Sequence, residues 1–332
     1  MNKTTMIDIG IDLGGTKMLV VLTNESGSVI ARSKKPTFPE QGVEDTVARL
    51  IEMVEGLLDN VFPYREACRI RSIGVAAAGI LEPASGTVVL ATNLRWRNVP
   101  ISSMLEERFR APVRLLNDAN AAALGEWRAG AGVGTKDMVF VTVSTGIGGG
   151  IVSGSRLILG ASDSAAELGH ISIDRSGPLC ACGNRGCIEM YAAGHSIARI
   201  AREGIAGGLA NGEAILKEAG GAAEALTAEH VAAAAIKGDK YAGSVIASAG
   251  KALGQGIVSI IHLINPKLVV IGGGVARSGR LLLEPMQKAI QEQGIPGLVG
   301  QVTVVPAMLG EDAGGVGAAM WRRYEEECLQ LR

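Results

Sequence analysis

The sequence predicts an α/β protein made of two domains, and three observations lead to this prediction. Segments that predict strands alternate with segments that predict amphipathic helices, an order typical of α/β proteins. A strand–turn–strand unit with glycines at the bend occurs twice, over Ile7–Leu22 and Val139–Ile151. The chain has 332 residues, 47% of them hydrophobic, which is enough for two cores. We expect a smaller N-terminal domain of residues 1–121 with 313–332, and a larger domain of residues 122–312.

The expected elements of the first half follow from its hydrophobic pattern and turn residues. Apolar and β-branched runs predict strands, and apolar residues three and four apart predict helices. These elements are strands over Met6–Leu22 (bent at Gly14-Gly15), Val29–Ala31, Ile70–Ala78 and Val113–Leu116, and helices over Glu44–Leu58 and from Ser102 or Ser103 to Phe109. Glu106 lies three residues after Ser103, the spacing of a capping box, so we expect one of the two serines to cap this helix.

The second half changes character after Glu189, where alanine-rich helical segments replace strands as far as Ile264. Residues 204–229 predict helical packing with loose turns. The expected elements outside that helical region are strands over Met138–Val143, Ile147–Val152 and Lys267–Ile271, and a closing helix over Ala313–Leu329.

Composition limits the kinds of partner that the protein can have. A formal net charge of -1 gives no general attraction to nucleic acid or to an anionic membrane. Asp8 and Asp12 interrupt the first apolar run, so we expect no secretory signal and no membrane span. The five cysteines make a poor disulfide framework, and a reducing compartment suits them better. These features predict a cytoplasmic protein.

The first glycine turn, Asp12-Leu13-Gly14-Gly15-Thr16-Lys17, lies between two predicted strands. Consecutive glycines let backbone N–H groups approach phosphate oxygens, and the Thr16 hydroxyl adds a donor. Asp12 is a candidate for holding Mg²⁺, which takes few protein carboxylates and keeps several waters. An ordinary glycine turn is the alternative, because short motifs also occur by chance.

The second glycine turn, Ser144-Thr145-Gly146-Ile147-Gly148-Gly149-Gly150, offers the same chemistry in the second half. A dinucleotide-binding fold also uses such a turn. Its register argues against that alternative, because Ile151 stands where the third glycine belongs and a strand is expected to follow instead of a helix.

Asn117 and Asp118 come where a predicted strand ends and an alanine-rich helix begins. Asp118 has two interpretations, a helix cap or a general base. Phosphoryl transfer needs positioning, charge neutralisation and one base, so the glycine turns favour the second interpretation.

One short segment contains His170, Cys180, Cys182 and Cys187, flanked by Glu167 and Glu189. Three thiolates and an imidazole are a suitable ligand set for a tetrahedral Zn²⁺. Four protein ligands leave no open position for a reactive water, so we expect a structural site.

These motifs together resemble the ROK family of sugar kinases and repressors, over nearly the whole chain from Met6 to about Met320. The family patterns match at Asp12–Lys17, Asn117–Ala122, Glu167–His170 and Cys180–Glu189. The duplicated strand–turn–strand unit also resembles the sugar kinase, actin and Hsp70 superfamily. That resemblance implies two ribonuclease H-like domains with an active-site cleft between them.

The resemblance implies roles for individual residues. Asp118 would be the general base, and the hexose would bind to Asn117, Asp118, Glu167, His170 and Glu189. Two loops of the family pattern, which here contain Gly79 and Asn93, would also contact the sugar, although alanine and threonine replace prolines in them. The phosphate side would consist of Asp12, Gly14, Gly15, Thr16, Lys17, Thr145 and Gly146, with Gly273 and Gly274 near the adenosine. Zinc would brace His170 and Glu189.

The resulting hypothesis is an ATP- and Mg²⁺-dependent kinase that phosphorylates the 6-hydroxyl of a hexose. Ala77-Ala78-Gly79 and Leu309–Gly314 resemble bacterial glucokinases, so glucose is the first choice. N-acetylmannosamine, or another N-acetylhexosamine, is the second. A silent sugar sensor and a DNA-binding repressor are further alternatives, and few residues precede Asp8 to hold a DNA-binding module. Family kinases are usually dimers or tetramers, so we expect a homodimer or homotetramer.

Overall fold

The structure is a computed structural model that describes residues 4–64, 67–208 and 212–330. The chain forms two compact units, which are described separately. The first unit consists of residues 1–135, 150–165 and 308–332, and the second of residues 136–149 and 166–307. These limits differ from the predicted division mainly in residues 122–135 and 150–165, which pack with the first unit.

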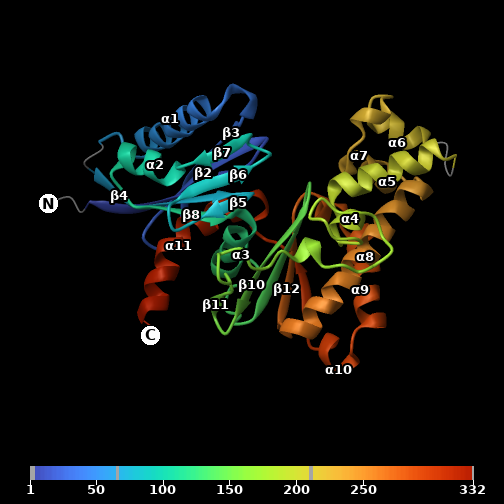
Figure 1. Cartoon of the computed structure of the whole chain (residues 1–332). Coiled ribbons are helices and arrows are strands. Elements are labelled where there is room, and N and C mark those ends of the chain that lie inside the picture. Colours follow the sequence, from blue (N-terminus) through green and yellow to red (C-terminus); the bar gives the residue numbers. More distant parts are fainter. Residues whose placement is uncertain (1–3, 65–66, 209–211, 331–332) are drawn as a thin grey trace. The chain divides into compact units, whose positions relative to one another are not determined.

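The first unit is built on a five-stranded sheet with the order β3-β2-β1-β4-β8 (Figure 1). β1 pairs antiparallel with β2, and parallel with β4, which continues the parallel pairing to β8. A small three-stranded sheet, β5-β6-β7, follows β4. The strands of this unit are β1 (Thr5–Leu13), β2 (Lys17–Thr23), β3 (Val29–Pro36), β4 (Cys68–Ala77), β5 (Ile80–Glu82), β6 (Thr87–Ala91), β7 (Trp96–Val99) and β8 (Val113–Asn117).

Helices cover both faces of this sheet, α1 and α2 one face and α11 with α3 the other (Figure 1). Side chains alternate across a strand, and β2 shows the result. Met18 and Val20 enter the core beneath α1, whereas Leu19 and Val21 pack with Val316 of α11. The helices are η1 (Pro39–Gln41), α1 (Val43–Val61), α2 (Ile101–Phe109), α3 (Asp118–Ala129), η6 (Gly310–Asp312) and α11 (Ala313–Gln330).

Helix α11 packs against the sheet backbone to backbone, because both surfaces carry glycine or alanine at the contact. A Cβ added to Gly10 of β1 would collide with the carbonyl oxygen of Gly315, and one added to Gly74 of β4 would collide with that of Ala318. The small residues at the start of α11 therefore let the helix backbone contact β1 and β4 directly.

The second unit contains the strands β9, β12 and β13, and its sheet has the order β11-β10-β9-β12-β13. β12 pairs parallel with both β9 and β13. The strands of this sheet are β9 (Met138–Val143), β10 (Ile147–Ser153), β11 (Arg156–Leu157), β12 (Leu268–Gly272) and β13 (Thr303–Pro306). The helices are η3 (Leu168–His170), α4 (Glu189–Ala192), α5 (Gly194–Ala206), α6 (Glu213–Glu218), η4 (Ala223–Ala225), α7 (Ala228–Ile236), α8 (Lys240–Ile264), η5 (Val275–Ser278), α9 (Arg280–Gln293) and α10 (Pro296–Val299).

Helix α8 is the one helix in the described part of the chain whose length and hydropathy would suit a membrane crossing. Two thirds of its apolar stretch, 67%, is buried within the protein. It packs along α9 and also contacts α7. Its apolar character is thus explained by its position in the core of the second unit.

The predicted elements are largely present, with some differences. The expected capping box at Ser103 is wrong, because α2 begins at Ile101 after Pro100, and both serines lie inside the helix. Glu106 instead accepts the backbone N–H of Val113 through its carboxylate, at 3.0 Å. The short strands β5–β7 and β11 were not predicted. Helical packing with turns over residues 204–229 is confirmed for the described residues, and 209–211 lie outside them.

Candidate functional site

Three parallel strands of the first unit end at the same sheet edge. Leu13 of β1 is paired with Ala77 of β4, which is paired in turn with Asn117 of β8. Asp12 and the first glycine turn lie at the end of β1, and Asp118 begins the helix after β8. Strand pairing therefore brings the predicted phosphate turn and the predicted base to one place, although about a hundred residues separate them in sequence.

The first glycine turn is held by hydrogen bonds to its own backbone. Gly14 donates its N–H to the carbonyl of Lys17 at 3.1 Å. Thr37 donates its hydroxyl to the Gly14 carbonyl at 2.6 Å and its N–H to the Thr16 carbonyl at 3.0 Å. The carbonyl groups of Gly14 and Thr16 thus accept hydrogen bonds from Thr37.

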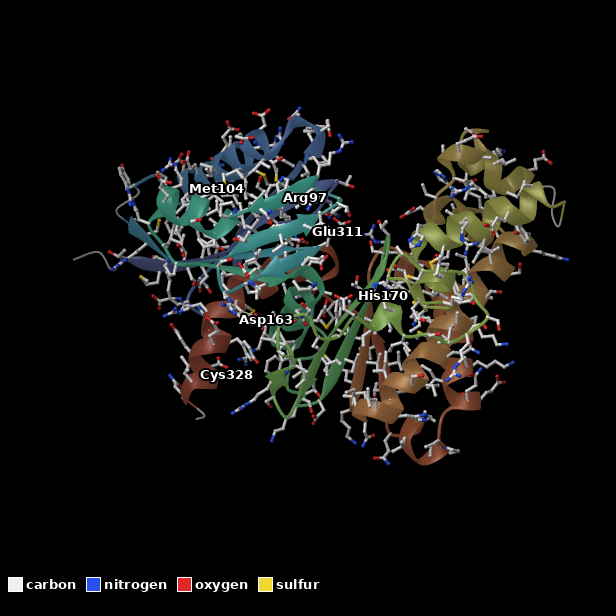
Figure 2. All side chains as sticks on the ribbon, viewed as in Figure 1. Arg97, Met104, Asp163, His170, Glu311 and Cys328 are labelled. Atoms are coloured by element: carbon white, nitrogen blue, oxygen red, sulfur yellow. The ribbon has the colours of Figure 1, made fainter. Side chains whose placement is uncertain are left out.

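Gly15 and Asn93 are in close contact. A Cβ on Gly15 would lie 2.7 Å from the Asn93 carbonyl oxygen and 2.8 Å from the Asn93 Cβ, so only glycine fits. The structure therefore places Asn93, predicted to contact sugar, directly beside the predicted phosphate turn. Lys17 forms an ion pair with Glu311 at 2.8 Å, and Figure 2 labels Glu311 on the segment that precedes α11.

The two aspartates at this edge have perturbed acidities. Burial and the nearby charge of Asp118 raise the pKa of Asp12 to about 7, against the opposing influence of Lys17. Burial also raises the pKa of Asp118, although a hydrogen bond from the Ala119 N–H opposes this. Two desolvated carboxylates close together favour a bound cation or a proton. This edge is suited to a divalent cation and to a proton acceptor near neutral pH.

Asn117 caps helix α3, which resolves the capping question for Asp118. The Asn117 Oδ1 accepts the N–H groups of Ala119 and Asn120, both at 3.0 Å. Asp118 is the first residue of the helix, and its Oδ1 accepts the adjacent N–H of Ala119 at 2.8 Å. Because Asn117 Oδ1 already accepts two N–H groups of the helix, its Nδ2 is the group that can donate a hydrogen bond to a ligand.

Gly79, the other residue predicted to contact the sugar in this unit, connects β4 to β5. Its φ is +117°, a conformation that side chains other than glycine rarely adopt, and an added Cβ would collide with the Leu90 carbonyl. Its requirement for glycine is thus accounted for by the backbone, and its contact with sugar stays a prediction.

The second glycine turn lies in the second unit, between β9 and β10. Ser144 donates its N–H to the Gly146 carbonyl at 2.8 Å. The element that follows is a strand, β10, as the sequence predicted, and this geometry excludes the dinucleotide-binding alternative for this turn. Gly273 lies at the end of β12 beside this turn, because a Cβ there would collide with the carbonyl of Val143, and Gly274 follows it into η5.

The predicted metal ligands form a single cluster. The ligand atoms of His170, Cys180, Cys182 and Cys187 all lie within 4.8 Å of one another. Cys182 Sγ is 3.6 Å from Cys187 Sγ, and Cys180 Sγ is 3.6 Å from His170 Nδ1. A tetrahedral Zn²⁺ with bonds of about 2.3 Å to sulfur separates two sulfurs by about 3.8 Å. The donor set and its spacing therefore fit zinc.

The acidity of the cluster also suits a cation. Burial raises the pKa of the Cys187 thiol to about 12, with neighbouring thiols adding to the effect. A bound cation reverses this preference, because it coordinates the thiolate and displaces the proton.

The two ring nitrogens of His170 face different groups. Its Nδ1 faces Cys180, and its Nε2 lies 3.9 Å from the Glu167 carboxylate (His170 is labelled in Figure 2). The carboxylate therefore lies near the second ring nitrogen, at a distance longer than a hydrogen bond. Glu189 begins α4 just after the last cysteine, and its Oε2 accepts the Ile147 N–H at 2.9 Å. The predicted sugar ligands Glu167, His170 and Glu189 thus belong to the metal-bearing segment.

Two further residues interact with the glycine turns. His195 hydrogen-bonds the Thr145 carbonyl through Nδ1 at 2.7 Å, and Glu311 pairs with Lys17. The sequence did not single out His195, because a histidine near a helix start is a common feature. Glu311 lies in the Leu309–Gly314 segment that resembles bacterial glucokinases, but its pairing with Lys17 was not predicted. Only the fold brings them to the turns.

The chain is similar in sequence to proteins of a known family. The sequence matches the profile of the ROK family over residues 8–325. The chain is 36% identical to a glucokinase of Thermotoga maritima over 313 residues, covering 94% of this chain and 95% of that protein. It is 34% identical to a putative xylose repressor of a Caldicellulosiruptor strain, covering 88% of this chain and 72% of that protein.

The fold is also similar to solved structures. One is a ROK family glucokinase from Streptomyces griseus in complex with glucose and AMPPNP, with a TM-score of 0.81 and 34% sequence identity. That comparison covers 96% of this chain and 99% of the other. The predicted α/β architecture with two domains of the sugar kinase type is confirmed.

Proposed function

The chain belongs to the ROK family, and from this premise we propose that it is a glucokinase that transfers the γ-phosphoryl group of ATP to the 6-hydroxyl of glucose. The sheet edge of the first unit carries the proposal, because Asp12, the Gly14–Lys17 turn and Asp118 lie together there. Phosphoryl transfer depends on positioning, on charge neutralisation and on a base for the attacking hydroxyl. This edge supplies candidates for all of them.

Asp118 is the proposed general base. Its carboxylate accepts the proton of the 6-hydroxyl as the sugar oxygen forms its bond to the γ-phosphorus, and the bond from that phosphorus to the β,γ-bridging oxygen breaks. Burial raises the pKa of Asp118, which makes the carboxylate a better proton acceptor than an exposed aspartate. Its position at the start of α3, beside the cap formed by Asn117, fixes its direction.

The glycine turns are proposed to orient the phosphates through backbone N–H groups, with Gly14, Gly15 and Thr16 in one turn and Thr145 and Gly146 in the other. Lys17 adds a positive charge to the first turn. Asp12 would hold Mg²⁺, which neutralises charge on the triphosphate when bound. Gly273 packs against Val143, which precedes the second turn, and Gly274 follows it; we assign both to the adenosine side.

The residues proposed to bind the hexose are Gly79, Asn93, Asn117, Asp118, Glu167, His170 and Glu189. Carboxylates and an imidazole suit sugar hydroxyls, which both donate and accept hydrogen bonds. Zn²⁺ on the four-residue cluster would keep His170 and Glu189 in place and supply no chemistry of its own. Assembly as a homodimer or homotetramer is also part of the proposal.

A coupled assay of ADP release tests the proposed reaction and its substrate. Glucose, mannose, fructose, N-acetylglucosamine and N-acetylmannosamine would be compared at equal concentration, with ATP as donor. We expect the highest kcat/KM with glucose. A higher value with N-acetylmannosamine would replace the substrate assignment, and no turnover with any hexose would favour a sensor or repressor.

A further inference from the structure

The second glycine turn is held from one side by the start of helix α5. Gly194 donates its N–H to the Ser144 carbonyl at 2.8 Å. His195 reaches the Thr145 carbonyl with Nδ1 at 2.7 Å and with its own N–H at 3.4 Å. A carbonyl oxygen can only accept, so His195 Nδ1 must carry the proton of this bond. The peptide planes of the turn are thereby fixed by an exposed side chain.

Glu189 holds the same turn from the other side. Its Oε2 accepts the N–H of Ile147, the first residue of β10, at 2.9 Å. The carboxylate also packs against the turn itself, because a Cβ on Gly146 would lie 2.7 Å from Oε2. The Glu189 main chain is anchored in turn, since Ser196 donates its hydroxyl to the Glu189 carbonyl at 2.7 Å.

Both holding side chains belong to one stretch that begins at the last cysteine. Glu189 follows Cys187 by two residues, and His195 lies in the first turn of the next long helix. The segment that carries His170 also packs closely against Ile147, because a Cβ on Gly169 would collide with the Ile147 carbonyl. The cysteine cluster and the second glycine turn therefore form one connected body.

We propose that Glu189 and His195 are positioning residues for the nucleotide phosphates, and that Glu189 shares its carboxylate between the second glycine turn and the hexose. Oε2 holds the Ile147 N–H while Oε1 accepts a sugar hydroxyl. The inference rests on the proposed function and adds a coupling to it. A ligand that orders Glu189 at Oε1 also orders the turn at Oε2, so hexose and nucleotide each raise the affinity for the other, by the same factor.

Isothermal titration calorimetry of the full chain tests the inference without turnover. Affinity for Mg²⁺–AMPPNP would be measured with and without glucose, and affinity for glucose with and without Mg²⁺–AMPPNP. For His195→Ala we expect nucleotide affinity to fall about threefold to tenfold, the effect of one lost hydrogen bond, with glucose affinity in the absence of nucleotide unchanged. His195→Asn, which can still donate to the Thr145 carbonyl, should restore most of the loss.

Two matched carboxylate variants complete the test. Glu189→Gln should weaken both ligands and bring the coupling factor close to one, because the amide cannot accept at both positions. Glu167→Gln, whose carboxylate faces His170, should weaken glucose and leave nucleotide affinity without glucose unchanged. Parent-like nucleotide affinity in both His195→Ala and Glu189→Gln would overturn the inference. A parent protein that binds AMPPNP with this pattern but phosphorylates no hexose would instead overturn the proposed function alone.

Discussion

The two glycine turns present the same backbone chemistry, but the protein supports them by different means. The first turn, Gly14–Lys17, is held by Thr37 and lies in a field of charges formed by Asp12, Lys17 and Glu311. At the second turn, Glu189 accepts the N–H of Ile147 and His195 donates to the Thr145 carbonyl, and both residues follow a cysteine-histidine cluster. Charged groups therefore surround the first turn, whereas a segment next to the candidate zinc cluster holds the second.

This difference suggests different roles for the groups of the two units. In the proposed function, the first unit carries the groups assigned to proton transfer and to cation binding, and the second unit carries groups assigned to holding ligands in place. The two sides should therefore respond differently to substitution, metal removal and pH.

The largest effect is expected for Asp118→Asn, which removes the base from the first unit. The amide cannot accept the hydroxyl proton, so kcat should fall by about 10²–10⁴. Glucose affinity, measured by calorimetry, should change by less than about fivefold, because the second unit keeps its sugar ligands. Turnover at the parent rate would contradict the assignment of the base.

Metal removal should damage the second unit selectively. Dialysis against a chelator is expected to release one Zn²⁺ per chain and to weaken the binding of both glucose and AMPPNP by about tenfold or more, because Glu189 bonds the second turn and is proposed to bind the sugar. Metal content would be measured by mass spectrometry, and affinities by calorimetry. Loss of glucose affinity with unchanged AMPPNP affinity would restrict the brace to the sugar ligands.

The sequence predicted the components of the site better than their supports. Glycine turns, the aspartate after a strand and the cysteine spacing are local patterns, so they can be recognised in the sequence. The partners of the turns are not local, because His195 lies 50 residues from Thr145 and Glu311 lies far from Lys17. The capping box failed for a similar reason, since Glu106 serves the backbone of Val113 instead of its own helix.

Adding a methyl group to each turn should separate the two kinds of support. In Gly15→Ala the new Cβ meets the backbone of Asn93, which cannot move alone, so we expect kcat/KM to fall by about 100-fold. In Gly146→Ala it meets the end of the Glu189 side chain, which can swing away at the cost of its bond to Ile147, so we expect about tenfold. Steady-state kinetics with ATP and glucose would measure both. Equal losses would show that the second turn is as rigid as the first.

The smallest effect concerns stability, and it isolates the electrostatics of the first turn. The pKa of Asp12 is raised from 3.8 to about 7, so the folded chain holds a proton that the unfolded chain releases. The free energy of unfolding must then decrease as pH rises from about 4 to about 7. Asp12→Asn has no such charge, so without divalent cations it should gain about 1–3 kcal/mol over the parent between pH 5 and pH 8, given that Asp12 keeps some exposure. Urea unfolding at both pH values measures this difference. Saturating Mg²⁺ should stabilise the parent and not the variant, because a cation bound to Asp12 favours its ionised form. If the two proteins lose stability in parallel, with and without Mg²⁺, then Asp12 is not the cation-binding carboxylate and the charge of the first turn must be balanced by another group.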